Sequence, residues 1–400
     1  NPCKFPSRFY NLHNITKKKI LEGIYMKLSC IQSNLRKGLA IVSRAVATRS
    51  TIPETQNVLI ATDNGRLKLT ATNLEIAITT WIGAQIEEEG SVTIPARMLS
   101  DFINSLPDKK VDIEMVPNPI GLKIHCANFD AQMNGIDPES YPPIPNITDG
   151  PKVSISSSDF KSSLSRVRFA VASDESRPAL TGVKVDIKEN QFTLASADGF
   201  RLAVETGSCE SSVEDDVSVI VPGRTMNEIF SLLGSDSGML DMTVTDQKSQ
   251  ALFKFGDIEV VTQLIQGNFP DYERLIPSEK GTICRVNRQE ILQATNAASV
   301  FARDGSGIIR MVSENVDNEG SVRIMSQAEE LGSNEARIKA DIEGEETRIA
   351  FNSKFLGEIL GVLDGDEIEI ETMSPSSPGV FRSAANSGYL HIIMPMFVQW

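Results

Sequence analysis

The chain has 400 residues, of which 40% are hydrophobic and 23% charged, and its formal net charge is −14. This composition is typical of a globular protein of two to four domains, and no apolar run approaches the roughly 20 residues that a membrane helix requires. The five cysteines are scattered and never form a CxxC pair, which argues against a disulfide framework or a zinc site. We expect a cytoplasmic protein with no membrane contact and no cofactor.

The first 25 residues differ from the rest of the chain. They carry five basic residues and one acid, and they lack the apolar core of a signal peptide. We expect residues 1–25 to be a non-native or disordered leader, with Met26 as the natural start. An amphipathic targeting segment is the alternative.

From Met26 onward, one unit recurs three times at a spacing of 125 to 131 residues. Each copy opens with a short strand followed by an amphipathic helix, whose apolar residues stand three or four positions apart. Leu35, Phe160 and Ile291 occupy the same place in that helix. The pattern predicts the same strand and helix at the start of each repeat.

A second helix follows a β-rich stretch in each repeat and begins within residues 94–99, 221–226 and 351–356. Each starts with a basic residue that is followed by an acid four positions later. Each ends at a leucine before a Pro, Gly or Asp turn, at Leu106, Leu233 and Leu363. The offsets of 127 and 130 residues are constant along this segment, so chance is a poor explanation.

Short alternating segments such as residues 66–70, 191–195 and 251–255 lie between turns and predict mostly antiparallel strands. Two helices with such strands make an α+β domain. Proline-bearing stretches at 141–145 and 269–272 mark the two junctions. We therefore expect three tandem α+β domains at residues 26–147, 151–277 and 281–400.

The first helix of every repeat is basic although the chain as a whole is acidic. Residues 29–51 hold four basic residues and no acid, residues 160–173 hold three and no acid, and residues 284–303 hold three with one acid. Any one such helix is ordinarily a solvated face, but three equivalent ones favour a surface that attracts a polyanion without reading sequence. The residues predicted to contact DNA on this ground are Arg36, Lys37, Arg44, Lys161, Arg166 and Arg168.

No motif for catalysis is present: the sequence has no HExxH, Walker A or GxSxG pattern. His125 and Cys126 stand in an alternating stretch and are expected to be strand residues. The acidic runs at 87–89 and 215–216 are expected to be solvated turns, and Asp198-Gly199 a tight turn between strands.

Several segments together resemble the bacterial sliding clamp family, the beta subunit of DNA polymerase III. The stretch 165–171, the segments 175–178 and 180–182, and the run Ala197-Asp198-Gly199-Phe200-Arg201-Leu202 resemble the family's middle domain. Residues 267–272 and the terminal Ile393-Met394-Pro395-Met396 match the same family. The resemblance covers residues 26 to about 398 in order.

The resemblance implies a non-catalytic processivity factor. Each chain is then three clamp domains in a half-ring, with two helices per domain packed on antiparallel sheets, and two chains close head to tail around duplex DNA. It places the contact between the two chains near Met133 in the first domain and at Val300 and Phe301 in the third. It adds Arg49, Arg177 and Arg224 to the predicted DNA contacts, whereas Asp174 departs from the family near DNA.

The resemblance also implies an apolar cleft for short peptides of the DNA polymerase III alpha subunit, the clamp loader, other polymerases and mismatch-repair proteins. Methionines suit such an adaptable pocket. The terminal 397–400 segment, Phe-Val-Gln-Trp, replaces a basic residue and a leucine at the cleft rim. The matching positions are Leu180, Ala197, Gly199, Arg201, Leu202, Pro270, Arg274, Leu275, Ile392, Met394, Pro395 and Met396.

Two other classes of function compete with this interpretation. A nucleotide-processing enzyme requires clustered carboxylates, and the sequence supplies no such cluster. An acidic scaffold that binds only proteins has no need for three acid-poor helices.

Overall fold

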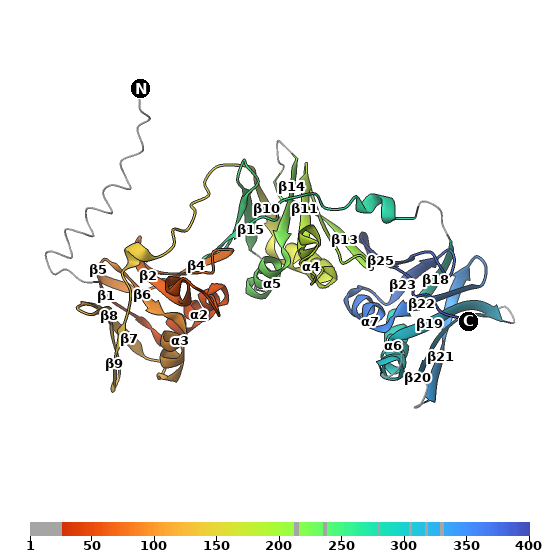
Figure 1. Cartoon of the computed structure of the whole chain (residues 1–400), viewed down its shortest axis with the longest axis horizontal. Coiled ribbons are helices and arrows are strands. Elements are labelled where there is room, and N and C mark those ends of the chain that lie inside the picture. Colours follow the sequence, from red (N-terminus) through yellow and green to blue (C-terminus); the bar gives the residue numbers. More distant parts are fainter. Residues whose placement is uncertain are drawn as a thin grey trace, which may run out of the picture. The chain divides into compact units, whose positions relative to one another are not determined.

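The computed structural model describes residues 26–211, 216–234, 238–277, 281–303, 306–316, 319–328 and 332–400 (Figure 1). The expectations for residues 1–25 and for Asp215 lie outside these ranges. The contacts divide the chain into two compact units. The first unit holds the described residues up to Gly150 together with Met239–Gln263, and the second holds Pro151–Gly238 and Leu264–Trp400.

Two helices form in each repeat, as predicted, and they lie side by side (Figure 1). The second helix ends immediately before Leu106, Leu233 or Leu363 in the three repeats, which confirms the predicted ends. The first helices are α2 (Gln32–Val42), α4 (Ser157–Val167) and α6 (Arg288–Arg303). The second helices are α3 (Ala96–Ser105), α5 (Gly223–Leu232) and α7 (Ser353–Val362).

The first helix of each repeat is held by its apolar stripe. Leu35, Phe160 and Ile291 are fully buried at equivalent positions, which follows from their spacing on one helical face. Each helix packs on the third and fourth strands of its own repeat: α2 on β3 and β4, α4 on β12 and β13, and α6 on β20 and β21. The three repeats seen in the sequence therefore pack their first helices on their strands in the same way.

The first unit contains a five-stranded antiparallel sheet in the order β5-β1-β7-β8-β9. A second sheet has the order β15-β16-β17-β4-β3-β2-β6 within this unit. The strands of the first sheet are β1 (Lys27–Ile31), β5 (Gln85–Glu88), β7 (Lys110–Pro117), β8 (Ile120–Cys126) and β9 (Phe129–Asn134). Those of the second are β2 (Asn57–Asp63), β3 (Arg66–Thr72), β4 (Ile76–Gly83), β6 (Ser91–Pro95), β15 (Met239–Val244), β16 (Gln250–Phe255) and β17 (Ile258–Gln263).

The second unit is built on one long antiparallel sheet in the order β14-β11-β12-β13-β25-β24-β23-β18-β21-β20-β19-β22, and β10 (Lys152–Ser156) leads into α4. The strands from the second repeat are β11 (Gly182–Lys188), β12 (Gln191–Ala197), β13 (Arg201–Ser208) and β14 (Val217–Pro222). Those from the third are β18 (Thr282–Asn287), β19 (Ile308–Val316), β20 (Glu319–Ala328), β21 (Gly332–Glu343), β22 (Thr347–Asn352), β23 (Glu367–Thr372), β24 (Gly379–Ser383) and β25 (Asn386–Ile393).

Consecutive repeats are joined by the same kind of strand pairing. In the first unit β17 pairs with β4, so that Val261 lies opposite Ala77. In the second unit β25 pairs with β13, so that Ile392 lies opposite Leu202. The fourth strand of one repeat thus receives the last strand of the next, and each pairing continues a sheet across a repeat boundary. The α+β class and the three tandem repeats are confirmed.

Candidate functional site

Four basic residues lie on or just after the first helix of the first repeat. Arg36 and Lys37 are exposed on α2, Arg44 is exposed in the 3-10 turn η1 (Ser43–Ala45), and Arg49 is exposed in the loop beyond. Arg36, Lys37 and Arg49 form no ion pair with another residue in the described ranges. Their charges are open to solvent, which suits contact with phosphate.

The cations of the second repeat are held against aromatic and polar groups. The Arg168 guanidinium lies 4.1 Å from the ring centre of Phe230, and the Lys161 ammonium lies 5.5 Å from it. Arg168 Nη1 donates to Asn227 Oδ1 at 2.9 Å and Lys161 Nζ donates to the Leu233 carbonyl at 2.6 Å. Both side chains are half-buried, so α5 fixes where their charges lie.

Arg166 is placed differently from the DNA contact predicted for it. It is 8% exposed, its Nη2 is 2.6 Å from Glu205 Oε1 and its Nη1 is 2.8 Å from Asp364 Oδ2. Burial lowers the pKa of Arg166, but the hydrogen bond and charge of Glu205 raise it, and the net direction is upward. Contrary to the prediction, Arg166 belongs to the core between the second and third repeats, because a buried charge needs its partners.

Two further predicted cations lie outside the first helices. Arg177 is exposed before the 3-10 turn η5 (Pro178–Thr181), and its Nη2 donates to the Asp198 carbonyl at 3.0 Å. Arg224 is exposed in the first turn of α5. Arg224 is therefore open to solvent on the second helix of its repeat, whereas Arg177 lies beside the Asp198-Gly199 turn.

The third repeat is less basic at its surface than the sequence indicated. Arg285 lies on β18 and not on the helix, and it is paired with Glu369 at 2.8 Å and Glu343 at 2.7 Å. Arg288 donates to the Gly365 carbonyl at 2.9 Å and the Leu360 carbonyl at 3.3 Å. Both charges are used within the fold, so the third helix, which the sequence already made the least basic of the three, presents still less positive charge.

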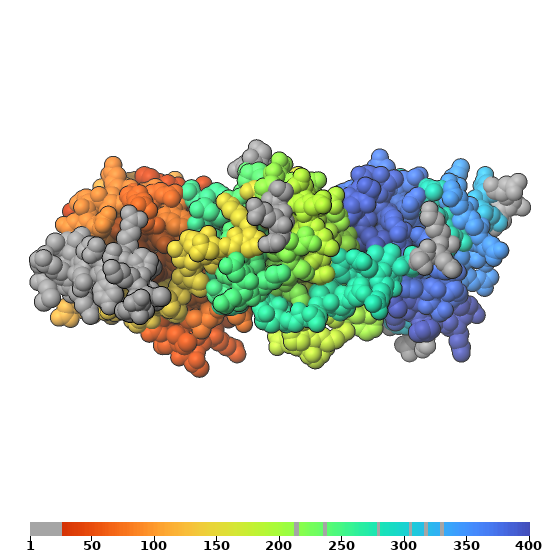
Figure 2. Space-filling model, turned by 90° about the horizontal axis from the view of Figure 1, so that it is seen from above, coloured from red at the N-terminus to blue at the C-terminus, as the bar shows by residue number. Residues whose placement is uncertain are grey.

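An apolar cluster occupies the boundary between the second and third repeats. It brings together four of the predicted cleft residues, and Leu202 and Ile392 are cross-strand neighbours in it. The segment 264–277 covers it partly, with Phe269 and Ile276 packed on it, and Figure 2 shows this teal segment on the surface between the green and blue repeats. The buried members are Ala172, Leu180, Ala195, Ala197, Leu202, Val204, Tyr272, Val380 and Ile392.

The predicted residues around this cluster are largely exposed. Pro270, Arg274 and Leu275 belong to or precede the 3-10 turn η6 (Tyr272–Leu275), where Arg274 is paired with Asp271 at 2.7 Å. Gly199 adopts a φ of +93° in an exposed turn, which glycine accepts without strain. Met394 is exposed, Met396 is half-buried and Pro395 is buried.

Two exposed aromatic residues were not among the predicted cleft positions, although the sequence analysis placed the 397–400 segment at the rim. Phe200 follows the glycine turn, and its carbonyl accepts a hydrogen bond from the Met394 amide at 2.8 Å. Phe397 is 86% exposed. Their only sequence signal is adjacency to the Asp-Gly turn and to the Met-Pro-Met run, since aromatic residues are otherwise expected inside.

Arg201 does not line a surface, as its predicted place in the cleft required. Its side chain is buried, with Nε 3.0 Å from Asp198 Oδ2, Nη1 paired with Glu358 of α7, and Nη2 donating to the Phe169 carbonyl at 2.6 Å. Its guanidinium carbon lies 5.2 Å from the ring centre of Phe169 and 4.3 Å from that of Phe355. Arg201 therefore joins the turn, the end of α4 and α7.

The residues predicted for contact between chains lie at two ends of the repeat series. Met133 is buried on β9, the last strand of the five-stranded sheet. Phe129, on the same strand and the same face, is 49% exposed and was missed by the sequence analysis. Val300 is 56% exposed on α6, and Phe301 beside it is half-buried.

Reactive groups are few in the described ranges. No group of three His, Cys, Asp or Glu residues there could hold a metal ion. His125 is a strand residue of β8, as predicted, and pairs with Asp130 at 2.8 Å. Burial raises the pKa of the Cys30 thiol to about 12 and that of the Cys209 thiol to about 11, which keeps both thiols protonated. No described helix is long and apolar enough to cross a membrane.

Comparison with known proteins gives the same result for all three repeats. Three family models match in order: the N-terminal domain of the DNA polymerase III beta subunit at residues 26–145, its central domain at 154–271 and its C-terminal domain at 273–397. The chain is 31% identical over 377 residues to the beta sliding clamp of Synechococcus elongatus, covering 93% of this chain and 99% of that protein. It is 29% identical over 381 residues to that of Bacillus subtilis, with the same coverage.

Solved structures agree. The crystal structure of the DNA polymerase sliding clamp from Bacillus subtilis matches with a TM-score of 0.89 at 28% identity, over 94% of this chain and 100% of that one. The DNA polymerase III beta subunit from Thermotoga maritima matches with a TM-score of 0.85 at 25% identity, over 94% and 100%.

Proposed function

The chain belongs to the DNA polymerase III beta subunit family, the beta sliding clamps, and is therefore a non-catalytic processivity factor of DNA replication; we propose that two copies form the ring through which duplex DNA passes. A ring holds DNA by topology. Its contacts to phosphate can then be weak and exchangeable, which permits sliding.

The strand junctions support closure by a second copy. Two junctions within the chain use the pairs β4 with β17 and β13 with β25. The equivalent strands left over are β21 at one end of the series and β9 at the other. In the described pairings β9 has one neighbour, β8, and residues 332–339 of β21 have one neighbour, β20. Each copy can supply the strand that the other lacks, which removes two open edges and gives a symmetric dimer.

Apolar residues stand where that dimer buries surface. Phe129 and Met133 face the same side of β9, and Val300 and Phe301 stand on α6, which packs on β21. A partner β21 paired with β9 brings α6 of the partner over Phe129. Burial of the exposed Phe129 and Val300 side chains on closure supplies favourable free energy for assembly.

The DNA-facing surface is proposed from the exposed and half-exposed cations of the helices. Arg36, Lys37, Arg44 and Arg49 supply it in the first repeat, and Lys161, Arg168 and Arg224 in the second. Arg177 lies in the loop after α4. Arg166 is excluded because it is buried, and in the third repeat Arg303 is exposed at the end of α6.

The partner site is proposed on the apolar cluster of the second and third repeats and its exposed rim. Leu202 and Ile392 form its floor, and Leu275, Met394 and Met396 its movable edge. An extended apolar peptide of the polymerase alpha subunit, the clamp loader, another polymerase or a mismatch-repair protein fits such a surface, since methionines adapt to several partners.

The recurring strand junction with one unused strand at each end carries the proposal, and retention on circular DNA tests it. Protein loaded onto nicked circular DNA is expected to remain bound through gel filtration at high salt and to be lost after the circle is cut once. Equal loss from intact and cut DNA would show that no ring encloses the duplex. The variant Phe129→Glu, at an exposed position of β9, serves as a control that disturbs closure and leaves the DNA-facing cations unchanged.

A further inference from the structure

The strand pairings fix which residues of the three repeats are equivalent. Val92, Val219 and Ile349 each stand four residues before the second helix, and they pair with Ile60, Val185 and Met311 respectively. Those three pair with Leu69, Leu194 and Ile324. The next pairing reaches the fourth strand of each repeat at Thr80, Glu205 and Ala336. One position earlier, Thr79, Val204 and Glu335 are therefore equivalent.

The same procedure relates the last strands of the first and third repeats. Leu28 and Cys284 each stand four residues before the first helix and pair with Ile113 and Ile370. The following pairings lead through Ile124 to Ala131 on β9, and through Phe381 to His391 on β25. Ala131 is thus equivalent to His391, and Asp130 is equivalent to Leu390.

These equivalences give the register of the closing junction. Within the chain, Val204 lies opposite Leu390 on the β13–β25 pairing. If a partner β21 takes the same register on β9, then Glu335 of the partner subunit lies opposite Asp130. The two junctions inside the chain have no such pair, since the equivalent positions are Val204 with Leu390 and Thr79 with Glu259.

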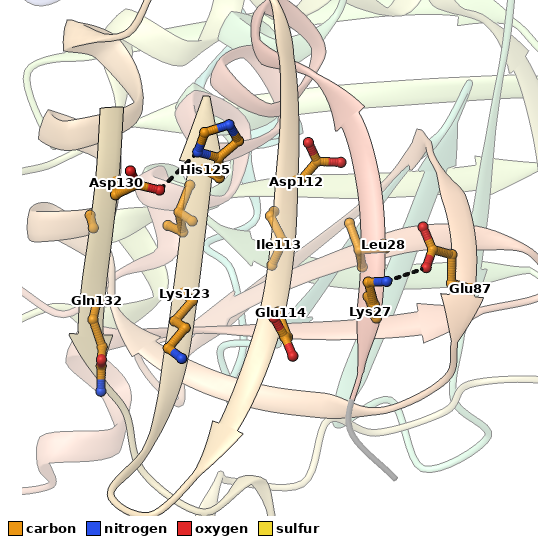
Figure 3. Close-up of a pocket in the computed structure, with 12 residues that line it drawn as sticks. Lys27, Leu28, Glu87, Asp112, Ile113, Glu114, Lys123, His125, Asp130 and Gln132 are labelled. Carbon is orange, nitrogen blue, oxygen red and sulfur yellow. Dashed lines mark hydrogen bonds and ion pairs between the residues drawn. The ribbon is translucent and has the colours of Figure 1, made fainter. Parts of the chain in front are cut away.

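Asp130 and Glu335 are both exposed, and each lies near a cation of its own chain. Asp130 Oδ1 is 2.8 Å from His125 Nδ1, and the two side chains point toward each other on the outer strands of the sheet (Figure 3). Glu335 is 3.6 Å from Arg323 Nη1, but Arg323 is closer to Glu314, at 2.8 Å. The cation nearest to Asp130 is therefore an imidazole, whose charge depends on pH.

The other charged groups near His125 are its cross-strand neighbour Asp112, groups that are ion-paired with each other, and a pair of residues two positions further along the same strands. Asp112 is its cross-strand neighbour on β7. Lys27 is paired with Glu87 at 2.6 Å, and Glu114 and Lys123 are cross-strand neighbours on the second row (Figure 3). On the partner side, Arg337 is 3.3 Å from Glu314. Four titratable residues therefore lie opposite one another on successive strands across the junction: Asp112, His125, Asp130 and the partner's Glu335.

We propose that ring closure is linked to proton uptake: protonated His125 neutralises the opposed carboxylates of Asp130 and the partner's Glu335 and tightens the dimer, and its deprotonation loosens the junction. This rests on the proposed two-copy ring. Like charges directly opposite on neighbouring strands destabilise a sheet. A proton bound more tightly in the dimer than in the monomer strengthens dimerisation as pH falls.

Dimer dissociation measured across pH tests the proton linkage. Between about pH 6 and about pH 8 at constant ionic strength, the dissociation constant of the native protein is expected to rise roughly tenfold, about threefold for each of the two identical junctions. The dimer of His125→Gln is expected to dissociate readily, with a dissociation constant that does not change with pH. The dimer of Asp130→Asn is expected to remain tight, also with a dissociation constant that does not change with pH. An unchanged pH profile in His125→Gln overturns the proposal, and so does a profile that rises in Asp130→Asn.

Cross-linking tests the register separately. The equivalences place Ala131 opposite Asn334 of the partner subunit, so oxidation of the double variant Ala131→Cys/Asn334→Cys is expected to give a covalent dimer, because facing strand positions meet disulfide geometry. Ala131→Cys/Ala336→Cys, displaced by two residues, is the matched control and is expected to remain monomeric on denaturing gels. Preferential cross-linking of the control overturns the register. Absence of any dimer at all concentrations would instead contradict the ring, and a dimer with flat pH dependence only the proton linkage.

Discussion

Arg166, Arg168 and Arg201 look alike in the sequence, but they lie in different surroundings. Arg168 stays half-exposed over Phe230, whereas Arg166 and Arg201 are buried and each has a carboxylate partner from the third repeat. Their partners Asp364 and Glu358 are more than 150 residues away in the chain. Helical spacing predicts which face a residue occupies, but not whether a distant carboxylate covers that face.

Truncation of Arg166 is expected to cost stability and not DNA affinity. Arg166→Ala leaves Glu205 buried without its guanidinium, and breaking such a pair costs about 3–5 kcal/mol. Urea unfolding measures the free energy directly. The control Arg36→Ala, at an exposed position, is expected to change stability by less than about 0.5 kcal/mol. Equal stability of the two variants would contradict the structural role of Arg166.

His391 makes stability depend on pH. Burial, and then the charge of Arg201, lower the pKa of His391 from 6.5 to about 3. Between these values the unfolded chain binds a proton that the folded chain does not, so the contribution is complete above about pH 6.5 and falls by roughly 1.4 kcal/mol per pH unit below it.

The variant His391→Asn isolates this effect from the titration of carboxylates. Its stability deficit relative to the native protein is expected to shrink between about pH 7 and about pH 5, because only the native protein loses the histidine contribution. Urea unfolding at both pH values measures the deficit. A deficit that does not change with pH would show that His391 is not held neutral in the fold.

Helices could be predicted more completely than sheets. Apolar spacing and terminal leucines are local signals, and the second helix of each repeat ends where they predicted. The pairing of β25 with β13 joins residues about 190 apart, and no local pattern specifies it. The sequence therefore predicted strands such as β12 and β16 without predicting the junctions that join one repeat to the next.

The end of a helix offers a prediction at the level of one element. Asn352 Oδ1 accepts hydrogen bonds from the Lys354 and Phe355 amides at 3.0 and 3.3 Å and caps α7. Asn352→Ala is expected to lower the free energy of unfolding by about 1 kcal/mol. Ser156→Ala, whose cap bond to the Asp159 amide is 3.4 Å long, is the control and is expected to cost less. Thermal unfolding ranks the two, and the reverse order would contradict the capping role.

Salt dependence tests the helix cations as a set. Replacing Arg36, Lys37 and Arg49 with alanine removes three of the proposed phosphate contacts, and the slope of log affinity against log salt is expected to fall by about 2.7 on duplex DNA. The same loss of charge at Lys188, Lys254 and Arg348, which lie on strands, is the control and is expected to leave the slope nearly unchanged. Fluorescence anisotropy at several salt concentrations gives both slopes. Equal slopes would show that net charge alone governs the binding.

At the scale of the molecule, the threefold repeat and its unequal charge were visible in the sequence. Both junctions pair the last strand of one repeat with the fourth strand of the repeat before it, so the repeated unit also determines how neighbouring repeats join. The third repeat presents less positive charge than the sequence indicated, because Arg285 and Arg288 are used inside the fold. The cleft residues were predicted through resemblance to the family, and the structure brings four of them into one cluster.

The mass of the assembly in solution tests the central claim that β9 and β21 are completed by a second copy. Sedimentation equilibrium is predicted to give twice the chain mass of 43.7 kDa, and Phe129→Glu, at an exposed position of β9, is predicted to shift the population toward single chains. A species that stays at the mass of one chain over the whole measurable concentration range would contradict the account.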